Sequence, residues 1–198
     1  MRALFAALML TLALGAPLAA QPGIEMPLPR EAPPPGYPPK RAEIPGTLGG
    51  KPVAWETFDY SIGAFDASAQ ARADWNTRVI SLSLMGMKPG KPDDDRQRIW
   101  IEAEFGTTLQ LGPSLGAAKV RLLRGKDIEG PRLVSEGATA EVVLDSIGPK
   151  MADSYSRHMT GYVSARLCPV GWLFRKCQDV TLRFDTDVQI DGDFPIKP

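Results

Sequence analysis

Histidine and cysteine are scarce in this sequence: its 198 residues include one histidine and two cysteines. A structural zinc site needs four such ligands, so His158 with Cys168 and Cys177 falls short of one. Eight residues separate the cysteines, whereas thiol oxidoreductases use the C-x-x-C spacing. The sequence therefore predicts no metal, no cofactor and no redox chemistry.

An excess of charge is also lacking, because 23 Lys and Arg residues balance 23 Asp and Glu residues. Domains that bind nucleic acid normally carry a basic excess on one face, so we expect no nucleic-acid partner. Helical periodicity is lacking as well. No stretch of about twelve residues places apolar side chains at the ~3.6-residue spacing of an amphipathic helix.

Catalytic motifs are a further absence. His158 stands in DSYSRHMTGY, close to Ser154, Ser156 and Thr160, but no G-x-S-x-G context surrounds these hydroxyls. A histidine acts as a base only where a nucleophile and an orienting acid converge on it. We therefore predict an exposed or strand-edge histidine, in a protein that is not an enzyme.

The N-terminus has the pattern of a secretory signal peptide. Met1 and Arg2 precede an apolar run over residues 3–20 that ends in small residues, so we expect residues 1–20 to be removed before Gln21. An uncleaved anchor is the alternative, because about 20 apolar residues can cross a bilayer. No other segment is long and apolar enough to span a membrane. A periplasmic or secreted protein without an integral span after cleavage is expected.

Residues 21–52 are rich in proline, with ten of the protein's 19 prolines. Proline fixes φ and has no amide hydrogen to donate, so it disfavours helices and central strands. The composition predicts a disordered, mostly extended tether, with Gly49 and Gly50 as a flexible joint.

Residues 53–198 show the period-two alternation of strands, separated by turn residues. Seven strands are predicted, at residues 55–62, 78–85, 98–105, 119–123, 138–147, 162–168 and 180–190, with a short eighth at 71–75. One polar face per strand is typical of antiparallel sheets that bury one side. We predict one all-β domain, an antiparallel β-sandwich of about 7–8 strands, with a small β-barrel as the alternative.

Cys168 ends one predicted strand, and Cys177 lies three residues before the last predicted strand, which starts at Val180. In an oxidising compartment an even number of cysteines usually means a disulfide, so we predict Cys168–Cys177. The loop that this disulfide would close contains three large apolar residues and two cations: Trp172, Leu173, Phe174, Arg175 and Lys176. Aromatic and arginine side chains often anchor interfaces. These five are the predicted partner-binding residues, and the alternative is that the loop folds back and covers the core.

These features favour a non-enzymatic binding or accessory module of the cell envelope, which presents loop 168–177 to another envelope protein or to a membrane surface. A narrower version is an inhibitor that inserts the loop into the cleft of an exogenous enzyme. The alternative class is a carbohydrate-binding or glycoside-hydrolysing domain. It would use Glu102 and Glu104, which share one strand face with Trp100.

Overall fold

The computed structural model describes residues 38–59, 68–90, 97–124, 132–136, 138–151, 155–170 and 176–198. The all-β prediction is confirmed, because these residues form strands and turns without a helix. The strands are β1 (Lys40–Leu48), β2 (Lys51–Phe58), β3 (Ala69–Ala73), β4 (Ile80–Gly86), β5 (Gln97–Glu104), β6 (Leu109–Gln110), β7 (Gly112–Pro113), β8 (Ala118–Arg124), β9 (Arg132–Val134), β10 (Ala140–Lys150), β11 (Ser156–Pro169), β12 (Gln178–Asp191) and β13 (Ile196–Lys197). In the described ranges, no helix is long and apolar enough to cross a membrane.

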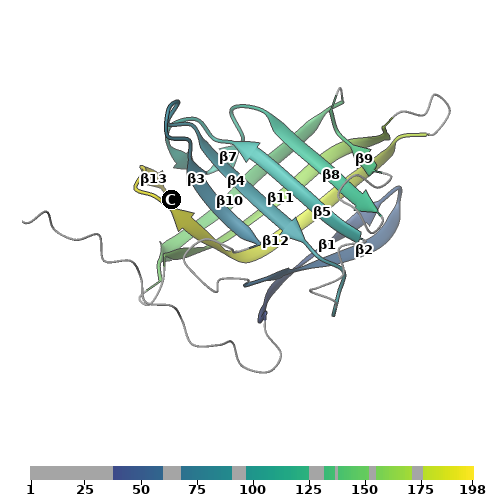
Figure 1. Cartoon of the computed structure of the whole chain (residues 1–198), viewed down its shortest axis with the longest axis horizontal. Coiled ribbons are helices and arrows are strands. Elements are labelled where there is room, and N and C mark those ends of the chain that lie inside the picture. Colours follow the sequence, from purple (N-terminus) through teal and green to yellow (C-terminus); the bar gives the residue numbers. More distant parts are fainter. Residues whose placement is uncertain are drawn as a thin grey trace, which may run out of the picture.

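Eleven strands of the described ranges form one hydrogen-bonded sheet, in the order β2-β1-β12-β3-β4-β5-β8-β9-β11-β10-β7, and β12 also pairs with β11. This extra pairing makes a closed circuit that leads from β12 through β3, β4, β5, β8, β9 and β11 back to β12. In Figure 1, β4, β5 and β8 lie in one layer and cross β10, β11 and β12 of the other layer diagonally. The core lies between two walls of strands, an arrangement that the predicted sandwich and its barrel alternative share.

The sheet is mixed rather than purely antiparallel. β12 pairs with β3 in parallel, with Gln189 opposite Gln70, and the small sheet of β13 and β6 is parallel as well. β1 is antiparallel to β12 and β2 is antiparallel to β1, so β2 runs in the direction of β12. β3 runs in the same direction as β2, and it therefore pairs with β12 in parallel.

The predicted tether over residues 21–52 is wrong in its last part, because β1 and the start of β2 lie inside it. Ile44 and Leu48 are buried, and they alternate with exposed residues as in any strand that covers a core. The exposed Pro45 precedes the first residue that pairs with β12, which is Gly46. The domain thus includes Lys40, well before the predicted start at Val53. The predicted signal peptide and residues 21–37 lie outside the described residues.

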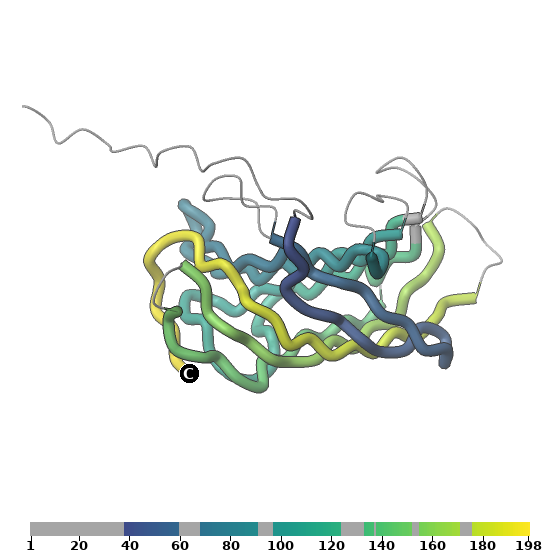
Figure 2. Tube along the Cα trace, turned by 90° about the horizontal axis from the view of Figure 1, so that it is seen from below, coloured from purple at the N-terminus to yellow at the C-terminus, as the bar shows by residue number. Residues whose placement is uncertain are grey.

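Prolines are tolerated here because of their positions. Pro52 belongs to β2, which ends the strand order of the sheet. A missing amide hydrogen costs least on such an edge strand, and proline there also hinders pairing with another chain. Figure 2 shows β1 and β2, in dark blue, beside β12 at the β1–β2 turn and diverging from it toward their other ends.

Most of the apolar positions that alternation predicted form the core of the described residues. Fully or nearly fully buried residues include Ile80, Leu82, Leu84, Ile99, Ile101, Val120, Leu122, Val142, Leu144, Val163, Leu182, Phe184 and Val188. Gly161 lies opposite Phe184 on the neighbouring strand. A Cβ atom at Gly161 would meet the Val143 carbonyl oxygen at 2.1 Å and the Phe184 ring at 2.5 Å. Glycine at this position therefore lets the Phe184 ring lie against the backbone of β11.

Candidate functional site

The predicted disulfide between Cys168 and Cys177 is present, with an S–S distance of 2.05 Å. The pairing of β11 with β12 ends at Leu167 and Gln178, so the disulfide takes the place of the next rung. Both strands are 14 residues long. The loop that the sequence identified is thus closed at the end of a long, continuously paired hairpin.

Neighbouring strands hold this end of the hairpin from both sides. Cys168 pairs with Val134 of β9, and the amide of Gly49, in the β1–β2 turn, donates a hydrogen bond of 2.8 Å to the carbonyl of Asp179. Two loop residues next to the disulfide are exposed: Val170, at 51 % of its surface, and Lys176. The base of the loop is therefore fixed by the sheet while these two residues face solvent.

Most of the predicted partner-binding residues lie where the structure describes no residues. Trp172, Leu173, Phe174 and Arg175 lie outside the described residues, and Lys176 is exposed. The alternative in which the loop covers the core depends on the same four residues. Both interpretations remain predictions for the tip of the loop.

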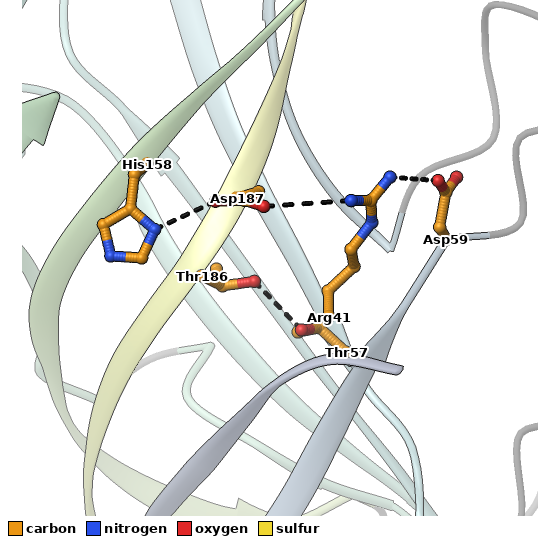
Figure 3. Close-up of polar contacts among 6 residues, drawn as sticks. All are labelled: Arg41, Thr57, Asp59, His158, Thr186 and Asp187. Atoms are coloured by element: carbon orange, nitrogen blue, oxygen red, sulfur yellow. Dashed lines mark hydrogen bonds and ion pairs between the residues drawn. The ribbon is translucent and has the colours of Figure 1, made fainter. Parts of the chain in front are cut away.

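A second polar constellation surrounds the histidine, and sequence reasoning did not find it. We call it the His158 cluster: Arg41, Asp59, His158, Asp185 and Asp187. Nδ1 of His158 lies 2.9 Å from Oδ1 of Asp187, and Nε2 lies 2.7 Å from Oδ1 of Asp185. The other carboxylate oxygen of Asp187 is 3.8 Å from Nη1 of Arg41, and Arg41 is also paired with Asp59. Figure 3 shows the chain of contacts from His158 through Asp187 and Arg41 to Asp59.

Strand alternation explains how the cluster forms. His158 and Asp187 are directly opposite each other on β11 and β12, and Asp185 lies two residues before Asp187, on the same face. Thr186 points the other way and is buried, with its hydroxyl 3.0 Å from that of Thr57. The cluster and this hydroxyl pair thus join β12 to β1 and β2 from its two faces.

These contacts occupy a stretch of β12 that has no paired strand on one side among the residues that the structure describes. In the described ranges β12 pairs with β1 only up to Leu182 and with β3 only from Gln189 onward. Between these points, side chains of the β1–β2 hairpin contact β12 in place of backbone pairing: Thr57 contacts Thr186, and Arg41 contacts Asp187.

Two carboxylates raise the pKa of His158 above its ordinary value. The hydrogen bond to Asp187 contributes most, partial burial opposes it, and the charges of Asp185 and Asp187 add to the increase. Both ring nitrogens have carboxylate partners, so neither is left to accept a proton from a hydroxyl nucleophile. The side chain is 52 % exposed, in agreement with the predicted surface histidine. The geometry suits a network of ion pairs between neighbouring strands rather than a catalytic base.

The carboxylates of the glycosidase alternative already have partners. Glu102 lies 3.6 Å from Nη1 of Arg121, and Glu104 accepts a 3.3 Å hydrogen bond from the amide of Ala117. The Arg121 guanidinium also lies 6.0 Å from the centroid of the Trp100 ring, and the indole nitrogen of Trp100 donates to Ser83 at 3.1 Å.

No group of three His, Cys, Asp or Glu side chains within the described part of the chain could hold a metal ion. Asp185 and Asp187 face His158, and Asp191 is paired with Arg72 at 2.6 Å.

Comparison with family models, with curated proteins and with solved structures gives no significant match to this chain.

Proposed function

We propose that the protein is a non-enzymatic binding module of the cell envelope that presents its disulfide-closed loop, residues 169–176, to a protein partner. The observation that carries the proposal is the base of this loop, which the disulfide closes and the sheet holds while Val170 and Lys176 stay exposed. The disulfide is consistent with an oxidising compartment such as the periplasm or the extracellular space.

The residue types in the loop support a protein partner. Tryptophan and arginine dominate interface hot spots, and phenylalanine is enriched at interfaces. A ring closed by a disulfide loses less conformational entropy on binding than an open loop does, so more of the contact energy appears as affinity. An inhibitor that inserts the loop into an enzyme cleft is a special case of this mode. The sugar-binding alternative is less favoured, because Glu102, Glu104 and Trp100 are engaged with their neighbours.

Affinity capture with matched variants tests the proposal. Wild type and the Trp172→Ser/Phe174→Ser variant are immobilised and incubated with envelope extract, and retained proteins are quantified by mass spectrometry. The control is Trp75→Ser/Leu115→Ser, which removes side chains that are 85 % and 65 % exposed elsewhere on the molecule. We expect one partner to be retained by wild type and control and lost from the loop variant.

Equal recovery by all three proteins would contradict the proposal. Thermal unfolding of each variant establishes that the fold is intact. Sedimentation with anionic vesicles separates a protein partner from a membrane surface: loop-dependent binding to vesicles without a retained protein would favour the membrane instead.

A further inference from the structure

A cleft of about 210 Å³ opens where the β10–β11 hairpin meets the segment that follows β12. It lies at the end of the β11–β12 hairpin opposite the disulfide. Its described lining is Lys150, Tyr155, Arg157, Ile190, Gly192, Asp193, Phe194 and Ile196. The amide of Ile190 donates a 2.7 Å hydrogen bond to the carbonyl of Tyr155, and Ile196 pairs with Leu109. One wall of the cleft is therefore tied to the main sheet and the other to the small sheet of β13 and β6.

Two cations face this cleft. Arg157 is oriented by a 2.9 Å hydrogen bond from its Nη1 to the carbonyl oxygen of Gly148. Lys150 Nζ lies 5.6 Å from the centroid of the Tyr155 ring. Among the described carboxylates, none forms an ion pair with either cation. The cleft thus offers two positive charges that these carboxylates do not neutralise.

The third charged group of the lining limits the charge of a ligand. Asp193 is exposed at the cleft, and its carboxylate offsets one of the two cations. Among the described lining residues one net positive charge remains, which complements a monoanion better than a dianion such as a phosphate monoester.

The remaining surface of the cleft is apolar and partly aromatic. Tyr155 is 66 % exposed, whereas Phe194 is only 9 % exposed. Ile190 and Ile196 are half-buried. Aromatic side chains favour offset or edge-to-face contacts with another ring. Because pockets for drug-sized ligands start at about 300 Å³, the ligand must be smaller than these.

We propose that this cleft binds a small aromatic monoanion of the aryl carboxylate class. The carboxylate lies between Lys150 and Arg157, and the ring packs against Tyr155 and Phe194. This site is independent of the loop proposed to bind a protein, which is at the other end of the same hairpin.

A titration followed by amide resonances of the ¹⁵N-labelled full-length protein tests the ligand class. The probes are benzoate, its neutral analogue benzyl alcohol, and sulfate, which has charge without a ring. We expect benzoate to shift the resonances of Tyr155 and Gly192 in a saturable way. It should bind about 1.5- to fivefold tighter than benzyl alcohol, which lacks the charge contact, and tighter than sulfate, which lacks the ring. Equal binding of benzyl alcohol or sulfate would overturn the proposal.

Two variants test the charges. Lys150→Gln should weaken benzoate binding about two- to fivefold, and Asp193→Asn should strengthen it. Lys51→Gln, which removes an exposed cation at the start of β2, serves as the control and should leave the affinity unchanged. Arg157 is kept because it also bonds the Gly148 carbonyl. If Lys150→Gln binds benzoate like wild type while its thermal unfolding is unaltered, the site is not an anion site.

Discussion

His158 and Asp187 face each other across β11 and β12, with Nδ1 of the histidine 2.9 Å from Oδ1 of the aspartate. The other carboxylate oxygen of Asp187 contacts Arg41 of β1. A side chain that can titrate near neutral pH is thereby part of the fastening between the N-terminal strand and the last long strand. Asp185 contacts the other ring nitrogen, so carboxylates surround the imidazole on both sides.

The stability of the protein should depend on the charge of His158. Its pKa in the folded state is raised from 6.5. The contribution of the imidazolium to the free energy of unfolding is therefore fully present below about pH 6.5, and it is lost as the pH rises through the raised pKa. Urea unfolding at several pH values should show wild type more stable than His158→Gln by ~0.2–1 kcal/mol at pH 6, with the difference shrinking toward pH 8.5. A histidine resonance that titrates at or below pH 6.5 would contradict this prediction.

The disulfide should stabilise the folded state by lowering the chain entropy of the unfolded state. Closing a ring of this size is expected to stabilise the fold by about 2–3 kcal/mol. The Cys168→Ser/Cys177→Ser variant should lose this amount in guanidinium unfolding, and wild type measured with reductant should match it. A loss from the variant that reductant does not reproduce would point to the serine hydroxyls rather than to the missing bond.

The buried hydroxyl pair should couple strongly. Thr57 and Thr186 are 0 % and 1 % exposed, so replacing one by valine leaves the other without its partner and costs about 1–3 kcal/mol. The double variant should cost less than the sum of the two single changes. A double-mutant cycle by urea unfolding measures the difference.

The exposed pair of Ser146 and Thr160, 2.7 Å apart, is the matched control for that cycle. Its coupling should be well below that of the buried pair, since water replaces a lost partner at the surface. Equal couplings would show that burial is not what makes the Thr57–Thr186 contact matter.

Alanine at position 161 should be poorly tolerated. The added methyl group would overlap the Val143 carbonyl and the Phe184 ring, and overpacking of this kind costs about 1–3 kcal/mol or more. Ser164→Ala, on an exposed position of the same strand, should change the free energy of unfolding by less than about 0.5 kcal/mol. A Gly161→Ala protein as stable as wild type would mean that β11 and Phe184 can move apart freely.

Much of the sheet could be predicted because every second side chain of a strand points to the same face, so buried and exposed residues alternate along the sequence. Residues 78–85 and 98–105 alternate apolar and polar side chains, and they correspond to β4 and β5. β1 was missed because its prolines outweighed the weaker alternation of Ala42, Ile44 and Leu48. Proline excludes a strand only where its amide is needed, and which amides are needed depends on neighbours that the local sequence does not specify.

The circuit of pairings and the His158 cluster had no local signal. Asp185 and Asp187 are on one face of a predictable strand, but their proximity to Arg41 follows only from the position of β1 beside β12. The disulfide was predictable because two cysteines allow one pairing. The tip of its loop remains a prediction.

The position of β12 also governs the order in which this chain can fold. β12 pairs with β1, β3 and β11, and the Thr57–Thr186 contact joins residues 129 apart in sequence. The N-terminal strands cannot complete their pairing until almost the entire chain is available. Such long-range pairing raises the contact order and slows folding. Until then β1 has an edge without its partner strand, so aggregation should be greatest before the last hairpin is made.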